Sequence, residues 1–259
     1  MYDYSSQDVL NSLIKLGIKK GDNIFCHSNT FLLGSPKGIL SKKNIYKTII
    51  EGFKLATGQE GTVFFPAFTY SFTKKKIFDL KMINKDNGIL SEMCIKSKES
   101  FRSLDPNFSV VGVGKNCKNF IKNLSENSYD ENSFFSRFVR ANGKICNINI
   151  NSVNIFIHYF ERLEKVNYRF DKTFTGKIMN NKKLLKKKSK IFVRKKINPS
   201  YVQSLNYFDL LCKNNKIYKM QKLGRGFISV MKLKEMGNLI NKELNIDPYF
   251  LTKLGKNNF

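Results

Sequence analysis

The spacing of apolar side chains changes along the chain, and its two periods predict a mixture of helices and strands. In residues 5–17 and 41–58, apolar side chains recur every three or four positions, after serines that can cap a helix and before a glycine that can end one. Short and densely apolar runs predict buried strands between such helices. The predicted strands are residues 19–28, 60–69, 107–114 and 144–150, and further helices are predicted at 88–97, 133–143 and 154–166.

The order of these elements predicts the fold class. Strands that alternate with helices favour a mostly parallel sheet covered on both faces. From about Asp171, short apolar or aromatic stretches separated by glycine and asparagine turns predict antiparallel strands, with helices at 201–213 and 232–244. We therefore expect an α/β/α layered fold. Residues 1–170 form its core with a mostly parallel central sheet, and residues 171–259 form a smaller C-terminal antiparallel lobe, packed on the core as one compact unit.

The chain is strongly basic, with a formal net charge of +26, and 41% of its residues are hydrophobic, which is enough for one sizeable core. Only seven of the 46 basic residues are arginine, and the lysines are scattered, so we do not expect a nucleic-acid partner. The dense basic run at residues 180–196 fits a solvated hairpin or edge strand. It also fits an anionic partner such as phosphate, an acidic glycan or a membrane surface, and both interpretations stay open.

The cysteines and the apolar runs limit the class of protein further. The five cysteines are odd in number and widely spaced, so neither a disulfide framework nor a zinc ligand set is expected. Two histidines without close metal-ligand spacing do not predict a metal site either. No apolar run approaches the roughly 20 residues of a membrane span, and the N-terminus does not resemble a secretion leader. We therefore expect a cytoplasmic location.

One of the two histidines, His158, lies in an apolar helical segment three positions before Glu161. Residues three apart share one face of a helix, so the carboxylate can orient the ring or raise its basicity. A neutral imidazole can then remove a proton from an attacking amine or hydroxyl near neutral pH. The alternative is that His158 is a hydrogen-bonded core side chain without a chemical role.

The other histidine, His27, lies with Ser28 at the end of the first predicted strand. Ligands of parallel sheets bind outside the carboxyl ends of the strands, so both histidines are expected at one cleft. His27 and Ser28 can line an extended, amide-bearing ligand, or they can simply form a strand-end turn. Adjacent strand residues point to opposite faces, which argues against Cys26 as a thiol nucleophile paired with His27.

Several segments, taken in order, resemble the aminoglycoside 3-N-acetyltransferase family over essentially the whole chain. They are a strand ending in a His-Ser pair (KKGDNIFCHSNTFLLG), a strand with Gly-Thr and Pro-x-Phe-Thr (EGTVFFPAFTYSF), an Arg-Ser segment with a proline (FRSLDPNFSVVGVGK) and a His-x-x-Glu helix (IHYFERLEKVNYR). The later FTG, LGRG and DPYFL resemble a branch found with surface-polysaccharide biosynthesis, whose substrates are amino sugars.

This resemblance implies an α/β/α fold unlike that of Gcn5-type acetyltransferases, with acetyl-CoA as the donor and no metal. It implies that His158 is the general base and that Glu161 orients it or contacts the acceptor amine. The residues implied for the pantetheine arm are His27, Ser28, Asn29, Leu33 and Gly34. Those implied for the rest of the coenzyme are Arg102, Ser103, Ser109 and Val110, with Arg102 meeting a phosphate. Substrate or oxyanion contacts are assigned to Thr69, Tyr70 and Asp105.

The acceptor expected from these features is an amino sugar. Asp105 stands where antibiotic-modifying members usually have histidine, and a chain of +26 repels polycationic antibiotics but attracts a nucleotide- or lipid-linked sugar. We expect direct acetyl transfer to the sugar amine in a ternary complex, with a small phosphate-bearing substrate as the partner. The alternatives are an aminoglycoside antibiotic 3-N-acetyltransferase, an inactive polyanion-binding homologue and a hydroxyl acceptor. The sugar, its carrier, the acylated position and whether the protein is a homodimer stay open.

Overall fold

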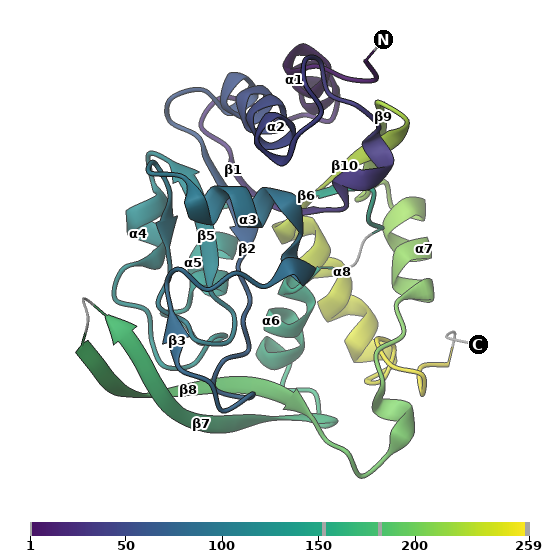
Figure 1. Ribbon diagram of the computed structural model, residues 1–259. Coiled ribbons are helices and arrows are strands. Elements are labelled where there is room, and N and C mark those ends of the chain that lie inside the picture. Colours follow the sequence, from purple (N-terminus) through teal and green to yellow (C-terminus); the bar gives the residue numbers. More distant parts are fainter. Residues whose placement is uncertain (1, 152–153, 181–182, 257–259) are drawn as a thin grey trace.

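The computed structural model describes residues 2–151, 154–180 and 183–256, and its centre is a seven-stranded sheet between two layers of helices (Figure 1). The strand order is β4-β5-β2-β1-β6-β10-β9. The bounds are β1 Asn23–Ser28, β2 Thr62–Pro66, β4 Phe101–Arg102, β5 Val110–Gly114, β6 Lys144–Ile148, β9 Lys219–Leu223 and β10 Gly226–Lys232. The expected α/β layered fold is therefore confirmed.

The sheet is more mixed than the mostly parallel sheet that we expected. Only β2, β1 and β6 run parallel at its centre, and β4, β5, β9 and β10 pair antiparallel on its two sides. Parallel neighbours need a crossover of a dozen or more residues, whereas only Gly224 and Arg225 separate β9 from β10. These two late strands, which we expected in the C-terminal antiparallel lobe, extend the main sheet.

Helices cover both faces of the main sheet. On one face lie α1 Ser6–Lys15, α2 Lys42–Thr57 and α3 Gly88–Lys96, and on the other lie α4 Cys117–Ile121, α5 Phe134–Arg140, α6 Phe156–Leu163, α7 Asn206–Asn214 and α8 Leu233–Ile246. Three short 3-10 turns complete the set: η1 Thr30–Leu33, η2 Lys85–Asn87 and η3 Pro199–Tyr201. The caps follow the sequence signals, since Ser5 forms a capping box with Asp8 and Gly58 ends α2 at φ 67°.

A second sheet lies across the lower edge of the molecule in Figure 1. It consists of β3 Phe78–Asp79, β7 Arg169–Asn180 and β8 Lys183–Arg194, in the order β3-β7-β8. β7 and β8 pair antiparallel along twelve residues each, and β3 adds to β7 in parallel. The long hairpin starts directly after the loop that follows α6, so its first residues pack against that helix.

Aromatic side chains fix the position of α6 against the sheet. Phe156, at the start of α6, has its ring centroid 5.4 Å from that of Phe25 in β1 and 5.1 Å from that of Phe135 in α5. Phe134 of α5 in turn lies 4.9 Å from Phe64 of β2. Edge-to-face contacts of this kind favour defined ring orientations, so the sheet, α5 and α6 hold one another in register.

In the part of the chain that the structure describes, no helix has both the length and the apolar character to cross a bilayer.

Replacing Phe138 by alanine should show how much this aromatic core contributes to stability. Its buried ring lies 5.4 to 6.2 Å from the rings of Phe25, Phe64, Phe120, Phe134 and Phe156. We expect Phe138→Ala to lower the free energy of unfolding by about 3–5 kcal/mol in urea titrations, because it leaves a cavity. Phe31→Ala is the matched control, since that side chain is 88% exposed, and should change it by less than about 0.5 kcal/mol. Equal losses in the two variants would contradict this account of the core.

Candidate active site

The predicted pair of His158 and Glu161 is formed on α6. The Nδ1 atom of His158 lies 2.6 Å from Oε2 of Glu161, within one turn of the helix. The helix buries one face against α5 and α8, and Glu161 is on that buried side, whereas the His158 side chain keeps 21% of its surface exposed. A carboxylate sealed in the interior therefore contacts a ring that solvent can reach.

The buried carboxylate of Glu161 has two further partners that come from the start of the hairpin. The Tyr168 hydroxyl donates to Oε1 at 2.9 Å, and Arg169 Nε lies 2.8 Å from Oε2. Burial would raise the pKa of Glu161, but His158, Arg169 and Tyr168 outweigh it and hold that pKa below its ordinary value. Burial and the neighbouring carboxylate raise the pKa of Tyr168, so its hydroxyl stays a donor. Glu161 is thus a charged acceptor at neutral pH.

This environment decides which nitrogen of His158 carries the proton in the neutral ring. An ionised carboxylate only accepts hydrogen bonds, so the group that faces Oε2 of Glu161 must be the Nδ1–H of His158. The Nε2 atom of the same ring is then the acceptor, and it points away from the carboxylate. In this tautomer the ring can accept a proton at Nε2.

The ring of Tyr129 borders His158 on another side. The two ring centroids are 6.5 Å apart in an edge-to-face arrangement, and Tyr129 is 2% exposed. Its hydroxyl is buried and has no hydrogen-bond partner among the described residues, and burial raises the pKa of Tyr129. Tyr129 therefore gives His158 an apolar wall together with one hydroxyl that can still donate.

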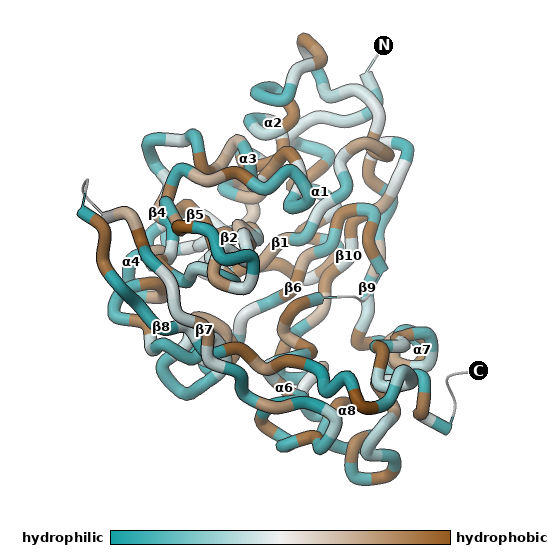
Figure 2. The backbone as a smooth tube through the Cα atoms, turned by 60° about the horizontal axis from the view of Figure 1, so that its bottom comes forward, coloured by the Kyte–Doolittle hydropathy of each residue, from teal (hydrophilic) through white to brown (hydrophobic). Residues whose placement is uncertain are grey.

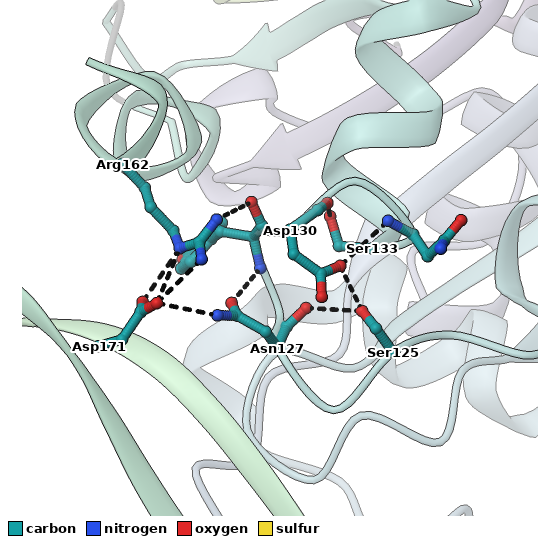
Figure 3. Close-up of polar contacts among 8 residues, drawn as sticks. Ser125, Asn127, Asp130, Ser133, Arg162 and Asp171 are labelled. Atoms are coloured by element: carbon teal, nitrogen blue, oxygen red, sulfur yellow. Dashed lines mark hydrogen bonds and ion pairs between the residues drawn. The ribbon is translucent and has the colours of Figure 1, made fainter. Parts of the chain in front are cut away.

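A polar network holds the loop that carries Tyr129 (Figure 3). Arg162 of α6 forms an ion pair with Asp171 of β7 at 2.9 Å, and the amide of Asn127 donates to the same carboxylate at 3.1 Å. Asn127 Oδ1 accepts from the Tyr129 backbone N–H at 3.0 Å, and Arg162 also donates to the Tyr129 carbonyl at 3.2 Å. Helix, hairpin and loop are thus joined beside His158.

His27 lies on the same face of the sheet as α6. Its ring centroid is 5.1 Å from that of Phe25, which in turn contacts Phe156 of α6, whereas Cys26 belongs to the core on the opposite face. The Nε2 atom of His27 is buried without a partner among the described residues, and burial lowers the pKa of His27 to about 4. This histidine is therefore neutral at pH 7, and it can hydrogen-bond a ligand but is a weak base.

The residues expected around the pantetheine arm gather at the carboxyl ends of β1 and β6. Ser28 pairs with Ile148 at that end, and the carbonyl oxygen of Asn29 accepts from Asn149 Nδ2 at 2.9 Å. A groove of about 580 Å³ opens beside them, and it is lined by Phe31, Leu32, Gly34, Asn149, Arg225, Gly226 and Phe227. Leu33 itself is buried in the core, so it supports this groove from beneath.

Gly34 is required at its position for conformational and steric reasons. Its φ is +81°, in the left-handed region, and a Cβ atom there would lie 2.3 Å from the Asp3 carboxylate. That carboxylate also forms an ion pair with Arg225 at 2.8 Å. The glycine thus lets the N-terminal segment close over one end of the groove.

Arg102 has an internal role instead of the expected contact with phosphate. Its Nη1 donates to the carbonyls of Leu80 and Met82, each at 2.6 Å, its Nη2 donates to that of Ala67 at 2.8 Å, and its Nε donates to Ser109 Oγ at 2.7 Å. Burial lowers the pKa of Arg102 to about 10. Each guanidinium nitrogen therefore already has a protein acceptor.

The residues near Arg102 that we expected to contact the coenzyme are also buried inside the protein. Ser103 Oγ accepts from the Val110 backbone N–H at 2.9 Å, and Ser103, Ser109 and Val110 are all buried. They hold β4 and β5 together behind the site. The structure therefore brings together the residues at the end of β1 but places the Arg102 group away from the groove.

The three residues assigned to substrate or oxyanion contacts lie on the side of Tyr129. Thr69 is buried and donates to the Pro106 carbonyl at 2.9 Å, so its hydroxyl is already used. Tyr70 adopts a left-handed conformation with φ 51°, and its ring lies 5.3 Å from that of Phe108. Asp105 accepts from the backbone N–H of Phe108 at 2.9 Å and from Ser128 Oγ at 2.6 Å, and burial raises its pKa. Asp105 thus anchors the loop that carries Tyr129.

Sequence reasoning did not assign roles to Tyr168, Arg169 or Tyr129. A signal for the first two was present, because a glutamate in an apolar helix needs buried partners, and a tyrosine and an arginine follow it within eight residues. Tyr129 lies in a polar loop whose position depends on tertiary contacts. Among the described residues, no three histidine, cysteine, aspartate or glutamate side chains gather as a metal site requires.

Comparison with known proteins supports the same assignment of family. The family model described as aminoglycoside 3-N-acetyltransferase matches residues 35–245, which is most of the chain. No match was found among the curated proteins.

Solved structures with this fold are similar along nearly their whole length. The chain matches AAC-VIa bound to sisomicin with a TM-score of 0.80 and 14% identity, covering 94% of this chain and 98% of that one. It matches the AAC(3)-IVa apoenzyme with a TM-score of 0.75 and 18% identity, covering 97% and 92%. The binary structure of AAC-IIIb with CoASH has a TM-score of 0.75 and 17% identity, covering 93% and 96%. At these identities, the likeness establishes the fold.

The lowered pKa of Glu161 should appear in the pH dependence of stability. A carboxyl whose folded pKa is depressed stabilises the native state above its unfolded pKa, and this contribution is lost as the pH falls through the folded value. We expect the wild type to have a larger unfolding free energy than Glu161→Gln at pH 7, and we follow this difference as the pH falls. It should shrink below the ordinary glutamate value of 4.5. Urea titrations at each pH measure it, and an unchanged difference down to pH 3 would show that Glu161 is not held ionised.

Proposed function

The chain belongs to the aminoglycoside 3-N-acetyltransferase family, and on that premise we propose that it transfers the acetyl group of acetyl-CoA to the amine of an amino sugar. The observation that carries this proposal is the 2.6 Å contact between His158 Nδ1 and the buried, ionised Glu161. It leaves Nε2 of His158 as a proton acceptor in a ring that solvent can reach. A base of this kind is what transfer to a protonatable amine requires.

The proposed step is direct transfer. The amine nitrogen attacks the thioester carbonyl, its proton passes to Nε2 of His158, and the thiolate of coenzyme A leaves with the electron pair of the broken C–S bond. Glu161 stabilises the imidazolium that forms, because its charge lies 2.6 Å from the other ring nitrogen. Arg169 and Tyr168 keep the carboxylate ionised and fixed, so little reorganisation accompanies the proton transfer.

For the coenzyme, we propose the groove at the carboxyl ends of β1 and β6. Coenzyme A carries an apolar and amide-bearing arm and several phosphates, and the groove offers the exposed ring of Phe31, the amide of Asn149 and the guanidinium of Arg225. The unpartnered Nε2 of His27, on the α6 side of β1, and the polar side chains of Ser28 and Asn29 at the end of that strand are the further coenzyme contacts that we propose. Support for coenzyme binding comes from the similar fold of AAC-IIIb, whose structure is a binary complex with CoASH.

For the acceptor, we propose an amino sugar that carries phosphate, linked to a nucleotide or a lipid. The charge of +26 favours an anionic substrate over a polycationic antibiotic. Asp105 does not offset this charge at an open surface, because its carboxylate is occupied by Ser128 and by backbone N–H groups. The electrostatic argument concerns the acceptor only and leaves the transfer chemistry unchanged.

A mass-spectrometric screen with acetyl-CoA tests the acceptor class. Nucleotide-linked amino sugars and the aminoglycosides sisomicin and gentamicin are incubated separately with the enzyme, and each product mass is measured. We expect a gain of one acetyl group, stable to mild base, on a nucleotide-linked amino sugar. Acetylation of the antibiotics alone would contradict the proposed acceptor, and an acetyl group released by mild base would show transfer to a hydroxyl.

Replacing His158 by glutamine should remove the base while leaving the coenzyme site intact. We expect the turnover number of His158→Gln to fall by roughly two to four orders of magnitude, since that is the range in which a positioned base contributes. The affinity for coenzyme A, measured by calorimetry, should change less than about twofold. The control is Lys165→Gln, which alters an exposed residue after the same helix and should keep full turnover. Near-normal turnover in His158→Gln would exclude His158 as the base.

A further inference from the structure

The β7–β8 hairpin carries a concentration of positive charge that the proposed reaction does not use. Between residues 172 and 208 the sequence contains ten lysines and one arginine, and no aspartate or glutamate. In β8, every residue from Lys183 to Lys188 is exposed, so this part of the hairpin is not covered by the rest of the chain. The strands reach the left edge of the molecule in Figure 1.

Pairing between the two strands places several of these lysines together. Lys177 is directly opposite Lys186, and Lys188 follows on the same face, opposite Thr175. We call Lys177, Lys186 and Lys188 the basic face of the hairpin. The residues on the alternate face include the buried Ile178, Ser189 and Ile191, which pack toward the body of the protein. Like charges directly across a pair of strands repel each other. An anion that binds at the basic face therefore reduces the repulsion between its lysines.

Two exposed leucines lie toward the end of the hairpin, Leu184 on the basic face beside Lys186 and Leu185 on the alternate face opposite Ile178. Leu184 is 48% exposed and Leu185 is 41% exposed. In Figure 2 the end of the hairpin shows a short brown segment, and a longer teal segment follows it along β8. An exposed leucine on the same face as several lysines combines an apolar contact with a binding site for anions.

We propose that the end of this hairpin docks on the surface of an anionic lipid bilayer. Leu184 enters the boundary between headgroups and acyl chains, while the lysines of the same basic face contact lipid phosphates. A soluble polyanion would satisfy the lysines but leave Leu184 in water, so the combination favours a membrane surface.

Co-sedimentation with vesicles tests this proposal and does not depend on the reaction. The probes are vesicles of phosphatidylcholine alone and vesicles of phosphatidylcholine with 30% phosphatidylglycerol. We expect the protein to sediment with the anionic vesicles only, and less so as the salt concentration rises. The triple variant Lys177→Gln, Lys186→Gln, Lys188→Gln should bind at least tenfold more weakly, and Leu184→Ser at least threefold more weakly.

The matched control removes the same charge from the opposite side of the main sheet. Lys15→Gln, Lys43→Gln, Lys47→Gln changes exposed residues of α1 and α2 and should bind the anionic vesicles nearly as well as the wild type. An equal loss in this control would overturn the proposal by showing a response to net charge alone. Unchanged binding by the leucine variant would overturn it in favour of a soluble polyanion, and no binding to anionic vesicles would overturn it outright. Folding of each variant is checked by its urea midpoint.

Discussion

The ionised carboxylate of Glu161, buried between a helix and a hairpin, is the constraint on which the rest of the site depends. An unpaired charge in the interior would destabilise the fold, so the chain must supply donors from elsewhere. Tyr168, just before β7, donates a hydrogen bond to the carboxylate, Arg169 at the start of β7 forms an ion pair with it, and His158 comes from one turn earlier in α6. The contacts that offset the free-energy cost of burying the Glu161 charge also fix the ring of His158 and its tautomer. Stability and chemistry therefore depend on the same four side chains.

The sheet and its aromatic core place this group of residues at the carboxyl end of the parallel strands. Phe25, Phe156 and Phe135 connect β1, α6 and α5 through ring contacts of 5.1 to 5.4 Å. The contact between Phe25 and His27 extends the same core to the end of β1. Both histidines thus share one side of the sheet although they are 131 positions apart in sequence, and the coenzyme groove lies at the same edge.

Local patterns were sufficient to predict much of this arrangement. The helices and central strands followed from periodicity and caps, and the spacing of His158 and Glu161 predicted their contact, because both signals act within one helical turn. The order of strands could not be predicted in the same way, since β9 and β10 join the main sheet by contacts far along the chain. The position of Arg102 also depended on distant residues, as three of its four acceptors are carbonyls from two other segments. A basic residue in a polar motif looks the same in sequence whether it meets a phosphate or a carbonyl.

The tautomer of His158 tests the central claim most directly, and the chain has only two histidines to assign. Nitrogen-15 NMR of the imidazole rings at pH 8, with His27→Gln used to assign the signals, distinguishes a proton on Nδ1 from one on Nε2. The structure predicts that neutral His158 carries its proton on Nδ1, with a long-lived hydrogen bond that disappears in Glu161→Gln. A proton on Nε2, or a mixture of tautomers unaffected by Glu161→Gln, would contradict the account.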